Sequence, residues 1–284
     1  MKRKIGTTSL EVFPIGLGGM PLSIQGRPSE GDALRVIHAS VGAGVNFIDT
    51  ANVYCLDDND IGHNERLIHK ALKEMKALNK VIVATKGGLT RPHGEWECDA
   101  SPKHLRLSCE KSLKALDVET ITLYQLHAPD SKVPFEDSVG ELARLKKEGK
   151  IIHVGLSNVS EKQLNIAQKI VRIETVQNRC SAAYKNDFNN GLIGTCKKQN
   201  ITYLPYSPLG GHFGHKNLSK NPILTKLAQK YKTSTYCIVL AWFLQKGDHI
   251  IPIPGASRIA SATDSPQAAY LKLDKEDCSL IDQL

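Results

Sequence analysis

Residues 44–54 read Gly-Val-Asn-Phe-Ile-Asp-Thr-Ala-Asn-Val-Tyr, and their pattern recurs along the whole chain. The apolar run 45–48 leads directly into Asp49, and a helix-like stretch follows at 63–76. Because the run is continuously apolar rather than alternating, it predicts a strand buried on both faces, as in parallel sheets. The stretch therefore predicts one strand–helix unit with a polar residue at the end of its strand.

Similar units fill the rest of the 284 residues. The other predicted strands are residues 15–17, 81–85, 121–126, 151–156, 175–176, 201–204 and 250–253. The predicted helices are residues 31–43, 63–76, 102–116, 135–148, 160–169, 189–199 and 235–246. Eight units of about 36 residues each favour an α/β fold, a single (β/α)8 TIM barrel over residues 1–284, with a doubly wound sheet as the alternative. Residues 5–13 predict a short N-terminal hairpin that plugs the bottom of the barrel.

The charge pattern narrows the class of partner. Lys and Arg number 37 against 29 Asp and Glu, which gives a net charge of +8. The basic runs are short and lack interleaved aromatic residues, so we expect no nucleic acid. A phosphate-bearing cofactor is an alternative reason for a basic surface.

Cysteine usage and hydropathy indicate the compartment. The seven cysteines are scattered without a C-x-x-C pair, which favours free thiols in a reducing environment. No apolar run approaches the length of a membrane span, and the N-terminus lacks the apolar core of a signal peptide. We therefore expect a cytoplasmic protein that makes no contact with a membrane; its oligomeric state is not predicted.

Polar residues follow several of the predicted strands. Asp49, Lys86 and His127 end three successive strands, with Lys86 37 residues after Asp49 and His127 41 residues after Lys86. The carboxyl ends of barrel strands meet at one face, where the active sites of such barrels lie. Tyr54, five residues after Asp49, is predicted to lie over the same face.

These four residue types suit carbonyl reduction. Tyr54 can donate a proton, and a neighbouring Lys86 ammonium is expected to lower the tyrosine pKa. Asp49 would keep Lys86 charged and oriented, and His127 can donate a hydrogen bond to a carbonyl oxygen. No side chain carries a hydride, so a nicotinamide cofactor is expected to supply it.

At these residues the sequence resembles the aldo-keto reductase family, over nearly the whole chain. The similar stretches are residues 44–54, 83–88 (Val-Ala-Thr-Lys-Gly-Gly), 123–130 (Leu-Tyr-Gln-Leu-His-Ala-Pro-Asp), 149–158 (Gly-Lys-Ile-Ile-His-Val-Gly-Leu-Ser-Asn), 176–178 (Val-Gln-Asn), 205–210 (Pro-Tyr-Ser-Pro-Leu-Gly) and 253–258 (Ile-Pro-Gly-Ala-Ser-Arg). The resemblance implies that Asp49, Tyr54, Lys86 and His127 form the catalytic tetrad of an NADPH-dependent reductase of a small carbonyl compound. No metal site is implied.

The resemblance also implies a set of cofactor-binding residues. Ser157, Asn158 and Gln177 would bind the carboxamide, and Tyr206 would stack on the nicotinamide ring. Ser207, Pro208 and Leu209 match the segment along the pyrophosphate, and Gly255, Ser257 and Arg258 match the segment at the adenosine 2′-phosphate. Gly19 and Met20 are expected near the cofactor, with Asp49 also counted among the binding residues. The family's residues at the adenine are replaced here by Ser261, Asp264 and Ser265.

Several alternatives stay open at this stage. A dedicated pyridoxal-type reductase, or a regulatory subunit that senses cofactor with the same barrel, would carry the same motifs. The substrate pocket is expected in loops 20–30, 87–100 and 210–220, with His93, Trp96, His212 and Phe213 as candidates. Glu95, Glu97, Cys98 and Asp99 lie with His93 in one loop, but their spacing matches no metal template. Cys55 is either an inert packed thiol or, beside Lys86, a thiol of lowered pKa that oxidises selectively.

Overall fold

Short parallel strands form the centre of the molecule, in a computed structural model that describes residues 2–284, apart from the side chains of His212 and Phe213. The strands are β3 (Leu17–Gly18), β4 (Phe47–Asp49), β5 (Ile82–Gly87), β8 (Ile121–Leu126), β9 (Ile151–Ser157), β10 (Ile173–Gln177) and β11 (Thr202–Tyr203). They pair in the order β11-β10-β9-β8-β5-β4-β3, and every pairing is parallel. Each of these seven strands therefore lies beside the one that precedes it in the chain, as in a barrel.

Residues 250–255 close the sheet into a ring. This segment forms single parallel bridges from Ile250 to Tyr203 on one side and from Gly255 to Gly18 on the other. The predicted eighth strand is thus present, but not as a continuous ladder. The reason is Pro252 and Pro254, whose carbonyls accept from Gly16 and Gly18 at 2.9 Å while their nitrogens have no hydrogen to donate.

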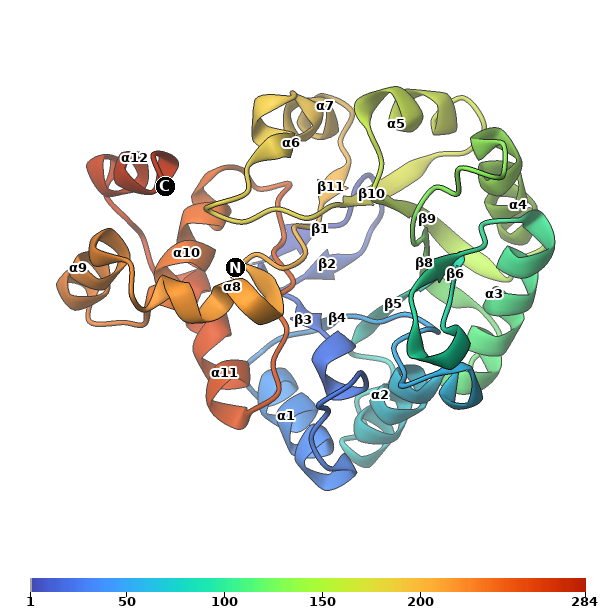
Figure 1. Ribbon diagram of the computed structural model, residues 1–284, viewed down its shortest axis with the longest axis horizontal. Helices are drawn as coiled ribbons and strands as arrows, with labels where there is room; N and C mark the ends of the chain where they lie inside the picture. The colour runs from blue at the N-terminus through green and yellow to red at the C-terminus, as the bar shows by residue number, and fades with distance from the viewer. Residues whose placement is uncertain (1) are drawn as a thin grey trace.

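A ring of helices surrounds the strands (Figure 1). Those that match the predicted helical patterns are α1 (Glu30–Gly42), α2 (His63–Glu74), α3 (Pro102–Leu116), α4 (Phe135–Lys147), α5 (Glu161–Ala167), α7 (Leu192–Lys198) and α10 (Thr235–Gln245). Local signals fix several starts: Ser101 caps α3, and Ser160 with Gln163 forms a capping box at α5. The predicted (β/α)8 barrel is confirmed.

The C-terminal half contains more helices than the patterns indicate. The additional ones are α6 (Asn186–Asn189), α8 (Gly211–Leu218), α9 (Pro222–Tyr231), α11 (Ile259–Asp264) and α12 (Lys275–Asp282). In Figure 1, α9 and α12 lie outside the ring, beside α10. Lys185 ties the chain end to this region by donating to the carbonyls of Ile281, Asp282 and Leu284.

The N-terminal hairpin lies across one end of the barrel, as predicted. It consists of the antiparallel strands β1 (Arg3–Lys4) and β2 (Glu11–Val12). Its residues Ile5 and Val12 are fully buried and pack into the barrel interior against side chains from the strands. The hairpin thus fills the bottom of the barrel with apolar side chains and leaves the other end for polar ones.

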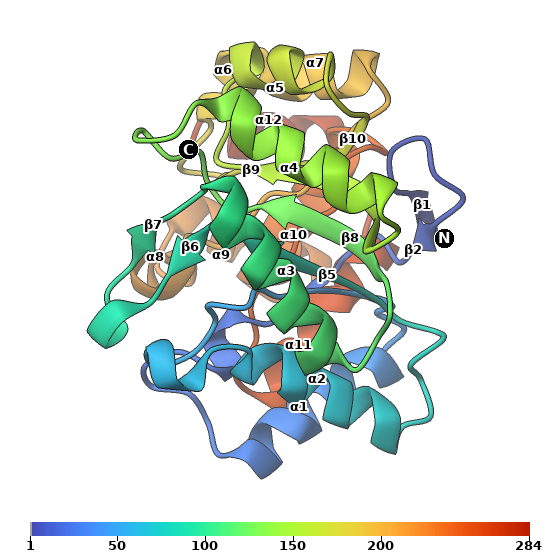
Figure 2. The same cartoon turned by 90° about the vertical axis from the view of Figure 1, so that its right-hand side faces the viewer.

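A second hairpin follows β5 at the opposite end of the molecule (Figure 2). Its strands are β6 (Leu89–Thr90) and β7 (Glu97–Cys98), which pair antiparallel around a short turn at Pro92–Gly94. Because β5 ends with Lys86 and Gly87, this hairpin projects from the strand that carries the predicted catalytic lysine.

Candidate active site

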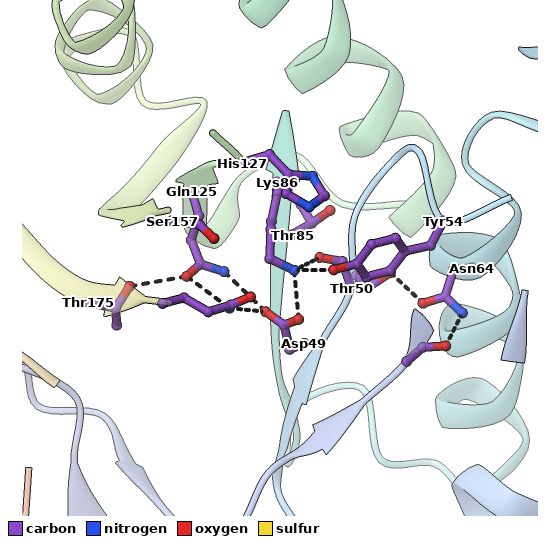
Figure 3. Close-up of polar contacts among 12 residues, drawn as sticks. Asp49, Thr50, Tyr54, Asn64, Thr85, Lys86, Gln125, His127, Ser157 and Thr175 are labelled. Atoms are coloured by element: carbon purple, nitrogen blue, oxygen red, sulfur yellow. Dashed lines mark hydrogen bonds and ion pairs between the residues drawn. The ribbon is translucent and has the colours of Figure 1, made fainter. Parts of the chain in front are cut away.

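The Lys86 ammonium is the centre of a buried hydrogen-bond network (Figure 3). Its Nζ donates to Asp49 Oδ2 at 2.6 Å, to the Thr50 carbonyl at 2.8 Å and to Tyr54 Oη at 3.0 Å. An ammonium carries three hydrogens, so these three bonds use all of them. The ammonium is fixed in one orientation, and the Tyr54 hydroxyl keeps its own hydrogen for another acceptor.

Strand register brings these side chains together. Asp49 is the last residue of β4, and Lys86 lies near the end of the adjacent strand β5. His127 follows β8, the next strand, and its main-chain nitrogen donates to Gly87. Its ring lies edge-on to Tyr54, with 5.7 Å between ring centroids. The convergence predicted from the strand ends is observed.

Burial controls the protonation of Tyr54 and Lys86. Burial raises the pKa of Tyr54 above its ordinary value, and the Lys86 ammonium opposes this rise without cancelling it. Lys86 lowers the pKa of Tyr54 as predicted, but burial outweighs this effect, so the expected net lowering is wrong. Burial lowers the pKa of Lys86, but attraction to Asp49 and Tyr54 outweighs it and leaves that pKa raised.

His127 is buried and neutral. Burial, with repulsion from Lys86, holds the pKa of His127 well below its ordinary value. Its Nδ1 atom has no hydrogen-bond partner among the described residues. A neutral imidazole carries one N–H, so His127 can donate a hydrogen bond while adding no second positive charge beside Lys86.

Two glutamines hold the other oxygen of Asp49. Gln177 Nε2 donates to Asp49 Oδ1 at 2.7 Å, and Gln125 Nε2 donates to the same oxygen at 3.2 Å. Gln125 was not predicted, although its position carried a signal. It follows Leu123 by two residues on β8, and Leu123 lies in the barrel interior, so alternation along the strand turns Gln125 inward as well.

The start of α2 supports both strand ends that carry the ion pair. Asn64 Oδ1 accepts from Thr50 Oγ1 at 2.6 Å, and Glu65 Oε1 accepts from Thr85 Oγ1 at 2.5 Å. Thr50 and Thr85 are the chain neighbours of Asp49 and Lys86. Burial raises the pKa of Glu65 to about 7, so this carboxyl gains a proton near neutral pH. These two supporting contacts from α2 were not predicted.

Several predicted cofactor residues gather at the ends of β9, β10 and β11. Asn158, in a left-handed conformation with φ 58°, donates from Nδ2 to the His127 carbonyl at 2.9 Å. Tyr206 Oη donates to Asn158 Oδ1 at 2.9 Å, and Ser157 is buried beside Asn158. After Tyr206, Ser207 turns the chain with φ 49°, and the adjoining residues are the buried Pro208 and the half-buried Leu209. Asn158 therefore links this group of residues to His127 of the tetrad.

The predicted phosphate segment is exposed at the start of α11. Gly255, Ser257 and Arg258 are all exposed, and Arg258 makes no salt bridge to a described residue. Asp264, in the region that differs from the family, accepts from Ser234 Oγ at 2.6 Å and so helps to cap α10.

The loop after β3 carries Gly19 and Met20 beside the tetrad. Gly19 donates to the Asp49 carbonyl at 2.8 Å, and a Cβ at this position would collide with Asn64 Oδ1. Glycine is therefore required here. Met20 packs against the small apolar group that includes Tyr54.

Trp96 lies beside the tetrad, as expected for a residue of the substrate pocket. Its ring is edge-on to Tyr54, with 6.4 Å between centroids, and 45% of the residue is exposed. His93 is exposed in the same hairpin. The other two pocket candidates, the side chains of His212 and Phe213, lie outside the described residues.

Cys55 has none of the properties of a sensor thiol. It is fully buried, and burial raises its pKa to about 11. The interpretation that Lys86 lowers this pKa is wrong; the partly opposing cation is Arg91. Thiolates are the species that oxidise, so this thiol is expected to be inert.

We therefore expect wild type and Cys55→Ser to lose activity at the same rate in hydrogen peroxide. The measurement is residual turnover against time of exposure, with dithiothreitol recovery as a second readout. A variant that survives clearly longer than wild type would restore Cys55 as the sensitive thiol.

Across residues 2–284, no group of three or more His, Cys, Asp or Glu side chains is arranged to hold a metal ion. Among the helices described, none is both long and apolar enough to cross a membrane.

The chain is similar to known proteins along nearly its whole length. The sequence profile of the Aldo/keto reductase family matches residues 14–284. The chain is 34% identical to a soybean (Glycine max) protein named "Probable aldo-keto reductase 1", covering 96% of this chain and 86% of the relative.

Solved structures give the same result for the fold. A thermostable aldo-keto reductase in complex with the inhibitor epalrestat superposes with a TM-score of 0.85 at 25% identity, covering 100% of this chain and 99% of that one. The glycerol dehydrogenase of Gluconobacter oxydans gives a TM-score of 0.85 at 27% identity, covering 99% and 94%.

Proposed function

The chain belongs to the aldo/keto reductase family of oxidoreductases, and from this premise we propose that it reduces an aldehyde or ketone to an alcohol with NADPH. The observation that carries the proposal is the buried chain of hydrogen bonds from Asp49 through Lys86 to Tyr54, with His127 beside it. This series of hydrogen bonds leaves one acidic hydrogen, on Tyr54, for the substrate.

Tyr54 is the proposed general acid. Lys86 donates to its oxygen, so the phenol hydrogen points away from Lys86 and toward an incoming carbonyl oxygen. As negative charge develops on that oxygen, Tyr54 transfers its proton, and the Lys86 ammonium stabilises the tyrosinate that forms. The raised pKa of Tyr54 keeps the proton on the phenol until then.

His127 is proposed to polarise the substrate carbonyl. Because its pKa is well below the ordinary value, the ring is neutral at pH 7 and donates one hydrogen bond. A neutral donor does not compete with Tyr54 for the role of acid. Asp49 acts through Lys86, which it keeps charged and oriented in a buried site.

The residues present fit nicotinamide adenine dinucleotide phosphate. Asn158, bonded to His127, and Ser207 both have left-handed backbone conformations, and the exposed Arg258 has no described carboxylate to neutralise it. Ser157, Asn158 and Gln177 would hold the carboxamide, Tyr206 the ring face, and Ser207 to Leu209 the pyrophosphate. The bound cofactor would supply the hydride; the protein positions it and supplies the proton.

The test is a panel of aldehydes and ketones assayed with NADPH and with NADH, following loss of absorbance at 340 nm. Steady oxidation that depends on the carbonyl compound supports the proposal. Tight NADPH binding without turnover of any compound would indicate a cofactor-sensing protein instead, and turnover of pyridoxal alone would indicate a dedicated reductase.

We expect Arg258→Ala to raise the dissociation constant of NADPH by about 10- to 150-fold. One charge-assisted pair with the 2′-phosphate contributes about 1.5–3 kcal/mol, and each 1.4 kcal/mol is tenfold. NADH lacks that phosphate, so its dissociation constant should be almost unchanged. Fluorescence titration of both cofactors measures this, and equal losses for both would assign Arg258 to folding or to adenine contact.

A further inference from the structure

Arg91 is a buried cation without a carboxylate partner. It is 4% exposed, and its Nη2 donates to the carbonyls of Cys55 at 3.3 Å and Leu56 at 3.1 Å. Its Nε and Nη1 are also buried and have no partner among the described residues. Together these two atoms carry three of the five guanidinium hydrogens.

No described carboxylate pairs with Arg91. Asp60, in the same loop as Leu56, pairs instead with Arg27 at 2.6 Å. The salt bridges found among the described residues include none to Arg91. Burying an ionised group without a counter-charge is unfavourable, and a binding site is one circumstance in which such a group persists.

A structural arginine in the same chain shows the contrast. Arg3 is 8% exposed, and its guanidinium donates to the carbonyls of Leu244, Gly247 and Ile250. Its Nη2 also lies 3.7 Å from Asp248. Arg3 therefore has both acceptors and a counter-charge, whereas Arg91 has two acceptors on a single nitrogen.

Arg91 contacts residues that adjoin Tyr54. Its Cζ is 3.9 Å from the centre of the Trp96 ring, and that ring is the one that lies edge-on to Tyr54. Cys55, whose carbonyl accepts from Arg91, follows Tyr54 directly in the chain. The guanidinium is thus separated from the mouth of the site by one indole ring, which is itself 45% exposed.

From this arrangement we propose that Arg91 binds an anionic group, a carboxylate or phosphate, on the same molecule that carries the carbonyl to be reduced. The Trp96 ring covers the guanidinium and moves aside when such a substrate enters. The proposal rests on the proposed reductase function and adds a substrate class: short aldehydes that bear an acid group. A substrate anion would supply the missing counter-charge and accept from Nε or Nη1.

The first test compares substrates of matched size on the wild-type enzyme. Succinic semialdehyde carries a carboxylate, and its methyl ester is the neutral match; glyceraldehyde 3-phosphate and glyceraldehyde form the phosphate pair. We expect kcat/KM to favour at least one anionic compound by about tenfold or more over its neutral match. Equal values for both pairs, or no turnover of these four compounds by an enzyme that reduces other carbonyl compounds of the panel, would overturn the proposal. No turnover across the whole panel would overturn the reductase function on which it rests.

The second test assigns the preference to a residue. In Arg91→Gln the ratio of kcat/KM between the anionic and neutral substrates should fall toward one, and Arg91→Lys should retain part of it, because a charge remains. The matched control is Arg35→Gln, at an exposed arginine on α1 that pairs with Asp32, which should leave the ratio at its wild-type value. A purely structural role for Arg91 would lower both rates equally and leave the ratio unchanged, which would contradict the assignment. If Arg91→Gln does not fold, the ratio of kcat/KM measured for wild type and for Arg91→Lys still tests the proposal.

Discussion

Tyr54→Phe is expected to reduce turnover by at least ~10²-fold while leaving the affinity for NADPH nearly unchanged. The substitution removes one oxygen, the acceptor of the Lys86 bond and the only hydroxyl in the tetrad. The ring keeps its apolar contacts and its edge-on position beside His127 and Trp96. Single-turnover absorbance measurements with saturating NADPH separate the chemical step from binding.

The control is Tyr124→Phe, which removes a different buried phenol oxygen, that of a tyrosine on β8. That hydroxyl donates to the Leu105 carbonyl at 3.4 Å, and among the described residues it has no hydrogen bond to the tetrad. If loss of any buried phenol oxygen disturbs the barrel, both variants will lose activity together. A Tyr54→Phe enzyme with wild-type turnover would remove Tyr54 from the proton-transfer step.

The barrel could be predicted because its strands are buried on both faces. Continuous apolar runs such as residues 121–126 and 151–156 coincide with β8 and with nearly all of β9. The weakest prediction was residues 250–253, where Pro252, with Pro254 directly after the run, replaces regular pairing with single bridges. The pattern also missed α9, although Asn221 and Pro222 form the cap and first turn that commonly start a helix.

The tetrad could be predicted because parallel strands in a barrel end at one face. That rule places Asp49, Lys86 and His127 together without knowledge of any side-chain geometry. It says nothing of residues that reach the site from a helix, which is why Asn64 and Glu65 were missed. It also cannot weigh burial against charge, and burial is what reversed the expected pKa directions of Tyr54 and Cys55.

The same limit applies to Arg91. In the sequence it is one of many arginines, in a loop where exposed charges are common. Its burial under Trp96 depends on how the β6–β7 hairpin folds back toward residues 54–56, a contact between segments more than thirty residues apart. Only the structure distinguishes it from Arg35 on the surface.

Lys86→Met is expected to abolish measurable turnover and to lower the free energy of unfolding by about 3–5 kcal/mol. The substitution leaves the Asp49 carboxylate buried, with only the amides of Gln177 and Gln125 as donors. Most of the expected loss comes from that stranded charge rather than from the attraction itself. Urea unfolding at pH 7, followed by tryptophan fluorescence, gives the stability, and the carbonyl assay gives the rate.

A double variant separates these two contributions. Adding Asp49→Asn to Lys86→Met removes the stranded charge, so stability should recover in large part while turnover stays lost. Lys70→Met, which breaks the exposed pair with Glu30, is the control and should unfold close to the wild-type urea concentration. A double variant as unstable as the sum of its two single variants would show that the buried pair is not coupled in this way. The expected result instead identifies an ion pair kept for catalysis, since two neutral side chains would hold the barrel nearly as well.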